Sequence, residues 1–229
     1  MKKHAIKVCG ICRPEDAHVA GGAGADFIGI LVNVKASQRS QTLEQAKAVA
    51  TATDVPLVLL LWEPSVEEAV KLAEELSPVA IQLLADETPE HLTAVKKACN
   101  CKVWKAIHLP ARGTSDVDVD TIVDRIGEFE IAGADAIVLD AKVVVDGREL
   151  RGGTGHASDW GIAAEIVRRV SIPVMLAGGI DPDNVVDAIE ATDPYGVDLA
   201  SGVESEKGKK DHEKIRTLVQ RVRALENAD

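Results

Sequence analysis

Two cysteines stand three residues apart near the start of the chain, at Cys9 and Cys12 in KVCGICRPEDA. A pair with this spacing can form a redox disulfide, supply half of a zinc site, or leave one thiol to act alone. A free thiol titrates near about 8.5, so a base at neutral pH needs a lowered pKa or an adjacent cation. Lys7 could supply that charge, or could be a buried structural lysine paired with a carboxylate.

The chain alternates short apolar runs with amphipathic segments from end to end. The runs typical of strands are 5–9, 27–32, 56–62, 79–84, 102–109, 136–140, 173–178 and 197–201. The segments with apolar residues at helical spacing are 14–23, 43–52, 66–76, 90–98, 119–132, 160–170, 183–191 and 211–225. Thr42, Ser65 and Ser158 precede three of these segments as predicted caps or first-turn residues.

This order predicts an α/β fold, a (β/α)8 TIM barrel that forms one domain over residues 1–229. Eight β-then-α units with strands apolar enough to be buried on both faces fit a closed barrel of this length. The alternative is a doubly wound open sheet, which usually carries G-x-G-x-x-G after its first strand. Cys9-Gly-Ile-Cys-Arg-Pro does not match that motif, so the barrel is favoured.

In enzymes with this barrel fold, the catalytic residues lie at the carboxyl ends of the strands. Alternation along 5–9 turns Lys7 and Cys9 inward if their neighbours face the helices. The same alternation makes Asp140, at the end of AIVLD, an inward carboxylate at the same rim. A thiol and a carboxyl group at one barrel mouth suit acid/base catalysis, although Cys9 could be packing and Asp140 a loop anchor.

The other two cysteines, Cys99 and Cys101, precede the fifth predicted strand and so belong to the opposite end of the barrel. A strand length of roughly 15 to 20 Å would separate them from Cys9, which excludes a four-cysteine zinc site. A redox pair is also disfavoured, because Cys9 ends a barrel strand rather than lying at a helix terminus.

Glycine clusters follow the last three predicted strands. Barrels often hold a phosphate with the loops after strands seven and eight, where backbone N–H groups can approach an anion closely. The residues concerned are Gly153 and Gly155 after strand six, Gly178 and Gly179 after strand seven, and Ser201 and Gly202 after strand eight. Three clusters at one end of the barrel predict a phosphorylated small-molecule ligand.

The composition disfavours some classes of binding partner. A formal charge of -11 repels phosphate backbones and anionic membrane surfaces, so no nucleic acid or membrane partner is expected. No apolar run reaches the roughly 18 to 20 residues of a membrane span, and the N-terminus has no signal-like segment. A cytoplasmic protein with reduced thiols is expected.

Over nearly its whole length the chain resembles the phosphoribosylanthranilate isomerase family of tryptophan and aromatic amino acid biosynthesis. The motifs that carry the resemblance are K-V-C-G-I at 7–11, E-D-A at 15–17, G-A-D at 24–26, V-L-D at 138–140, G-G-T-G at 152–155, L-A-G-G-I-D-P-D-N-V at 176–185 and S-G-V-E at 201–204. The resemblance implies a cofactor-free barrel enzyme that carries out an Amadori rearrangement of N-(5'-phosphoribosyl)anthranilate.

Residue by residue, the resemblance implies that Cys9 is the general base and Asp140 the general acid. Arg39 matches the family arginine that holds the anthranilate carboxylate, a task for which planar bidentate geometry favours guanidinium. A solvated loop arginine is the alternative for Arg39. Lys7 and the glycine-rich loops would complete the substrate site.

The chain departs from the family pattern around the aryl half of the site. Gln82-Leu83-Leu84-Ala85 lacks the histidine of Q-L-H-G, Ser37-Gln38-Arg39 replaces Ser-Pro-Arg, and Leu60-Leu61-Trp62 replaces Phe-Val-Asn. Either the chain is a divergent isomerase of the same substrate, which is favoured, or it accepts another amine or sugar.

Two further classes are disfavoured. A barrel that only binds a phosphometabolite would not need Cys9 opposite Asp140. A metal-dependent epimerase would need inward histidines and carboxylates at several strand ends, and His108 alone is well placed, so no metal is expected. The charged terminal segment is expected to be a solvated outer helix, with a homodimer contact as the alternative.

Overall fold

The computed structural model of the chain describes residues 4–35, 37–110, 117–145, 148–151 and 159–228. In this part of the chain, parallel strands form one sheet: β1 (Ala5–Val8), β2 (Phe27–Val32), β4 (Leu57–Leu61), β5 (Ala80–Leu83), β6 (Lys102–Pro110), β7 (Ala136–Val145), β9 (Val174–Leu176) and β10 (Gly196–Leu199). Neighbours in the sheet are neighbours in the chain, and β1 pairs with both β2 and β10. The sheet is therefore closed into a barrel, as predicted.

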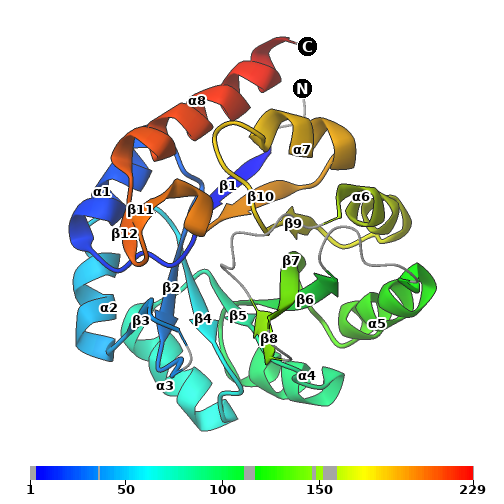
Figure 1. Cartoon of the computed structure of the whole chain (residues 1–229). Coiled ribbons are helices and arrows are strands. Elements are labelled where there is room, and N and C mark those ends of the chain that lie inside the picture. Colours follow the sequence, from blue (N-terminus) through cyan, green and yellow to red (C-terminus); the bar gives the residue numbers. More distant parts are fainter. Residues whose placement is uncertain (1–3, 36, 111–116, 146–147, 152–158, 229) are drawn as a thin grey trace.

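The helices form a ring outside the strands (Figure 1). They are α1 (Pro14–Ala23), α2 (Leu43–Ala50), α3 (Val66–Leu76), α4 (Pro89–Ala98), α5 (Val119–Ile131), α6 (Trp160–Arg169), α7 (Val185–Thr192) and α8 (His212–Ala228). Each follows a barrel strand, which confirms the alternating pattern read from the sequence. Within the described residues, no helix combines the length and apolar character that a membrane span requires.

Side chains cap several of these helices. Thr42 and Ser65 accept hydrogen bonds from the first turns of α2 and α3, as predicted, and Thr42 forms a reciprocal capping box with Gln45. The third predicted cap, Ser158, lies outside the described residues, and α6 is capped by Asp159, whose carboxylate accepts from the N–H groups of Gly161 and Ile162. An anionic cap also suits the positive end of the helix dipole.

Alternation along the strands divides the apolar residues into two layers. Ile6 and Val8 belong to the large cluster between sheet and helices, whereas Cys9 belongs to a smaller cluster inside the barrel. On β7, Leu139 faces the helices and Val138 the interior. Residues two apart therefore share a face, as the period of a strand requires.

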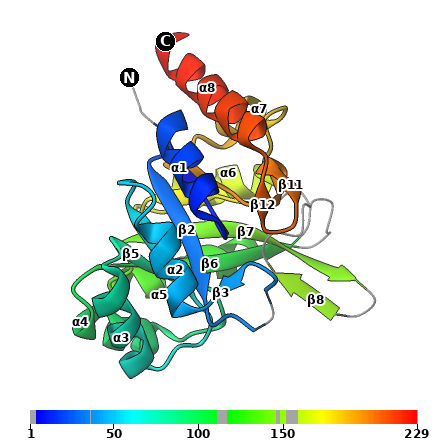
Figure 2. The ribbon, with the colours of Figure 1, turned by 90° about the vertical axis from the view of Figure 1, so that its left-hand side faces the viewer.

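Some elements escape the repeating pattern. β7 runs five residues beyond its predicted end at 140 and pairs there with the antiparallel β8 (Arg148–Arg151). β3 (Ser40–Gln41) pairs with β2, and a short turn of 3-10 helix, η1 (Ser201–Val203), leads into the β11–β12 hairpin (Glu204–Glu206 and Lys209–Lys210). Figure 2 shows the β7–β8 extension and this hairpin on the same side of the molecule.

Candidate active site

The first strand places a cation beside a thiol. Lys7 and Cys9 both point into the barrel and are 0% and 7% exposed. The Lys7 Nζ lies 3.2 Å from the Cys9 Sγ and 2.8 Å from a carboxylate oxygen of Asp198. Lys7 is therefore both the adjacent cation and the paired lysine that the sequence offered as alternatives.

Asp198 is a charged residue of this site that sequence reasoning missed. It lies on β10 in register with Lys7 on β1 and is 7% exposed. Its neighbours Val197 and Leu199 pack in the outer layer, so the carboxylate must point inward. That alternation within V-D-L was the signal available in the sequence.

The Cys9 thiol is held in its neutral form. Burial raises the pKa of Cys9 to about 11, and the negative charge of Asp198 acts in the same direction. The cation of Lys7 lowers this pKa but does not outweigh burial. A thiol base at neutral pH was expected to have either a lowered pKa or an adjacent cation. The structure supplies the cation, Lys7, but does not lower the pKa of Cys9.

Asp140 faces the same interior from β7, between Leu139 and Ala141. Burial raises the pKa of its carboxyl group to about 7, and the charge of Asp198 contributes further. One of its oxygens accepts a hydrogen bond of 2.8 Å from the N–H of Ala141. A carboxyl group with this pKa still holds a proton near neutrality, which a general acid requires.

The loops after β9 and β10 pack backbone against backbone. Gly178 and Gly179 adopt φ angles of 90° and 65°, a region that favours glycine. A Cβ atom on Gly202 would lie 1.9 Å from the carbonyl oxygen of Ile180. The structure thus brings Gly178, Gly179 and Gly202, which were predicted to bind the phosphorylated ligand, together with Ser201 at the start of η1. Gly153 and Gly155 lie outside the described residues.

Replacement of Gly202 by alanine is expected to destabilise the protein by about 1–3 kcal/mol, the usual cost of forced overpacking. The reason is the carbonyl oxygen of Ile180, which belongs to backbone and cannot swing away. Thermal unfolding measures the effect. Gly127→Ala in α5 is the control, because its added Cβ meets nothing within 4 Å, and equal melting temperatures for the two variants would contradict the prediction.

Arg39 extends over the end of β1 in a buried position. Its guanidinium donates to both oxygens of Glu204, with Nε and Nη2 at 2.8 and 2.7 Å. Gly10, with a φ of 69°, lies beneath the side chain, and a Cβ there would come within 2.5 Å of the Arg39 Cδ. Arg39 is therefore no solvated loop residue, and its role toward a substrate carboxylate stays a prediction.

The remaining cysteines do not join Cys9. The Cys12 Sγ contacts the carbonyl oxygens of Gly10 and Arg39, and Cys99 and Cys101 lie before β6. All four thiols are free. Among the described residues, no group of three or more histidine, cysteine and acidic side chains could hold a metal ion.

The positions that depart from the family pattern lie in the loop after β2 and at or just beyond the ends of β4 and β5. Trp62 is 39% exposed, and Leu84 follows the end of β5. The backbone oxygen of Leu84 lies 2.9 Å from the Nε2 of His108, an inward residue of β6 that is in register with Asp140. An imidazole from the next strand therefore contacts the backbone of the position at which the family pattern has a histidine.

Comparison with known proteins gives one consistent result. The family model described as N-(5'phosphoribosyl)anthranilate (PRA) isomerase matches residues 6–221. The isomerase of that name from Methanocella arvoryzae is 37% identical over 95% of this chain and 97% of its own length.

Solved structures agree with the sequence match. Monomers generated from the dimeric phosphoribosylanthranilate isomerase of Thermotoga maritima superpose with a TM-score of 0.79, at 26% identity over 97% of this chain and 100% of that one. A phosphoribosyl anthranilate isomerase in complex with reduced 1-(o-carboxyphenylamino)-1-deoxyribulose 5-phosphate gives a TM-score of 0.77, also at 26% identity, over 97% and 100% of the two chains.

Proposed function

The chain belongs to the N-(5'-phosphoribosyl)anthranilate isomerase family, and we propose that it converts N-(5'-phosphoribosyl)anthranilate into 1-(o-carboxyphenylamino)-1-deoxyribulose 5-phosphate through Cys9 and Asp140. The observation that carries these roles is the arrangement of the barrel mouth. A thiol beside a lysine faces the same interior as a carboxyl group whose pKa is raised to about 7. The glycine-rich loops after β9 and β10 adjoin the same opening.

Asp140 acts first in the proposed mechanism. Its proton passes to the furanose ring oxygen while the bond from that oxygen to C1' breaks. The lone pair of the amine nitrogen forms the new C1'=N bond, so the open-chain intermediate is a protonated Schiff base. With a pKa of about 7, the carboxyl group of Asp140 is protonated in a large fraction of the protein molecules near neutral pH.

Cys9 acts second, as a thiolate that removes the proton from C2'. The C–H electrons form a C1'=C2' bond and the C1'=N electrons return to nitrogen, which gives an enolamine. A proton then adds to C1' while the C2' hydroxyl loses its own, so the ketone forms without net gain or loss of protons. The positive charges of the Schiff base and of Lys7, 3.2 Å from the sulfur, favour the thiolate at this step.

The two ends of the substrate have separate binding groups in this proposal. The phosphate binds to backbone N–H groups around Gly178, Gly179, Ser201 and Gly202. Arg39 binds the anthranilate carboxylate. Turnover of a related amine or sugar is the competing reading, because Trp62 and Leu84 alter the aryl pocket, but a buried Arg39 beside Cys9 favours the carboxylated substrate.

The direct test is an assay with purified protein and N-(5'-phosphoribosyl)anthranilate, whose fluorescence decays as it is consumed. Expression in a cell that lacks this step of tryptophan synthesis should restore growth without tryptophan. Decay together with rescue supports the proposal. If the substrate persists, the result would contradict the proposed reaction and would favour a different phosphorylated substrate for this barrel.

Chelators are expected to leave the rate unchanged, because every proposed step uses side chains of the chain itself. The measurement is the same fluorescence decay before and after dialysis against EDTA. Loss of activity that is restored by a divalent cation would contradict this and revive the metal-dependent epimerase reading.

The proposal also covers the domain organisation, the location and the oligomeric state of the protein. The chain folds as one domain, functions in the cytoplasm, and forms a homodimer. The dimeric state named for the Thermotoga maritima relative supports the last of these.

A further inference from the structure

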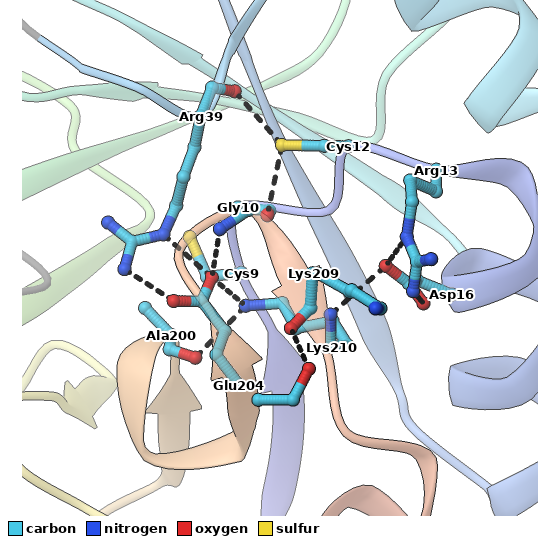
Figure 3. A network of polar contacts seen from close by, with 12 residues as sticks. Cys9, Gly10, Cys12, Arg13, Asp16, Arg39, Ala200, Glu204, Lys209 and Lys210 are labelled. Carbon is cyan, nitrogen blue, oxygen red and sulfur yellow. Dashed lines mark hydrogen bonds and ion pairs between the residues drawn. The ribbon is translucent and has the colours of Figure 1, made fainter.

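A buried cluster of three charged side chains lies beside the catalytic thiol. Arg39, Glu204 and Lys210 are 6%, 8% and 2% exposed. Glu204 receives two hydrogen bonds from Arg39, at 2.8 and 2.7 Å, and one of 3.1 Å from the Lys210 Nζ. Figure 3 shows these three side chains meeting next to Gly10 and Cys9. We refer to them as the Arg39 cluster.

The cluster carries one positive charge more than its own members balance. Burial alone would raise the pKa of Glu204, but the bonds from Arg39 and Lys210 hold that pKa below its ordinary value, so the carboxylate is ionised. Burial lowers the pKa of Lys210, and the charge of Glu204 opposes that shift. Two cations around one anion leave a net charge of +1 in a buried place, which favours an anionic ligand.

Arg39 retains hydrogen-bonding capacity in this arrangement. A guanidinium has five N–H donors in a planar fork, and Glu204 takes the Nε edge together with one donor of Nη2. Neither bond uses Nη1. The edge formed by Nη1 and the second donor of Nη2 matches the two oxygens of another carboxylate.

Glu204 and Lys210 are held by their own surroundings rather than by Arg39 alone. They are register partners in the β11–β12 hairpin, and the Lys210 Nζ also donates to the carbonyl oxygen of Ala200 at 3.0 Å. The hairpin follows directly on η1, which contains Ser201 and Gly202. The segment from η1 to β12 thus contains both the proposed phosphate-binding residues Ser201 and Gly202 and the residue that contacts the Arg39 guanidinium, Glu204.

We propose that Glu204 and Lys210 are positioning residues that present the second edge of Arg39 to the aryl carboxylate of the ligand. Glu204 fixes the plane of the guanidinium, and Lys210 offsets the charge of Glu204 so that Arg39 faces the ligand as a net cation. The site therefore selects phosphosugar amines that carry an aryl carboxylate over those that lack one. This inference rests on the proposed function, in which Arg39 binds that carboxylate.

The test compares two ligands that differ only in the carboxylate. One is reduced 1-(o-carboxyphenylamino)-1-deoxyribulose 5-phosphate, and the other is its phenylamino counterpart without the carboxyl group. Calorimetric titration of the whole protein gives both dissociation constants, and their ratio measures carboxylate selectivity. The unaltered protein should bind the carboxylated ligand about tenfold or more tightly, as charge-assisted bidentate bonds imply.

Glu204→Gln and Lys210→Met should each lower this ratio about fivefold or more, with little change in affinity for the ligand without the carboxylate. Lys210→Arg, which keeps the charge, should restore most of the ratio. In an Arg39→Met background, Glu204→Gln should have no additional effect. Loss of affinity for both ligands alike would instead assign the cluster a purely structural role and overturn the proposal.

The matched controls lie on the same hairpin. Glu206 and Lys209 form an exposed ion pair at 3.1 Å, and Glu206→Gln and Lys209→Met should leave the ratio unchanged. A ratio near one in the unaltered protein, or a ratio insensitive to Glu204→Gln and Lys210→Met, would also overturn the inference. Failure of the proposed function is a separate result, because it would appear as binding of neither ligand and no turnover.

Discussion

Asparagine in place of Asp140 lowers kcat by at least about 10²-fold, the lower range for loss of a positioned acid. An amide cannot give a proton to the departing ring oxygen. The fold should persist, because the N–H of Ala141, 2.8 Å from the present carboxylate, can donate to an amide oxygen as well. The rate of fluorescence decay under saturating substrate measures the loss, with circular dichroism as the control for folding. Turnover close to that of the unaltered protein would refute the assignment.

The pH profile gives the same prediction a second readout. The productive form has Asp140 protonated and Cys9 ionised, and the pKa values of these groups are about 7 and about 11. Below pH 7 the thiolate fraction grows with pH, so kcat/KM rises. Above pH 7 the loss of the Asp140 proton offsets that growth, so kcat/KM levels off until the thiol itself titrates.

In the Asp140→Asn variant nothing offsets the growing thiolate fraction. Its residual kcat/KM should therefore continue to rise beyond pH 7, and the break near 7 should disappear. Comparison of the two proteins with the same substrate removes the contribution of substrate ionisation. A break near pH 7 that survives in the variant would show that another group produces it.

Serine in place of Cys9 is also expected to lower kcat by at least about 10²-fold. A hydroxyl is a far weaker acid than a thiol, and the burial that raises the pKa of Cys9 would disfavour an alkoxide more strongly. Lys7 is paired with Asp198 at 2.8 Å, and the substitution does not remove either partner, so the barrel interior should stay intact. Turnover with saturating substrate measures the effect, and a rate near that of the unaltered protein would remove Cys9 from the mechanism.

Cys12→Ser is the matched control for that variant. The Cys12 Sγ contacts two backbone carbonyl oxygens, of Gly10 and Arg39, and a serine hydroxyl can donate to either. Activity should be retained. Equal loss in both variants would point back to a redox pair formed by the two thiols.

Local periodicity accounts for what the sequence predicted well. Strand ends fall within two residues of the expected ranges except in β7, because short apolar runs bounded by helical segments leave little freedom in an α/β chain. The inward direction of Lys7, Cys9 and Asp140 follows from the two-residue period alone. The layers observed around Val8 and Leu139 confirm that reasoning.

Pairings between distant residues were not accessible in the same way. Lys7 meets Asp198 across 191 positions, and Arg39 meets Glu204 across 165. Neither contact has a local signal, because it depends on closure of the barrel and on the hairpin after η1. The raised pKa of Cys9 has the same origin, since burial and the charge of Asp198 arise only in the folded chain.

The most direct test is a crystal structure of this protein with reduced 1-(o-carboxyphenylamino)-1-deoxyribulose 5-phosphate. The Cys9 sulfur and the Asp140 carboxyl group should flank the pentose, each within about 3.5 Å of the chain from C1' to C4'. The phosphate should lie against Gly179 and Gly202. A pentose bound with either the thiol or the carboxyl group turned away from it would contradict the proposed acid/base pair.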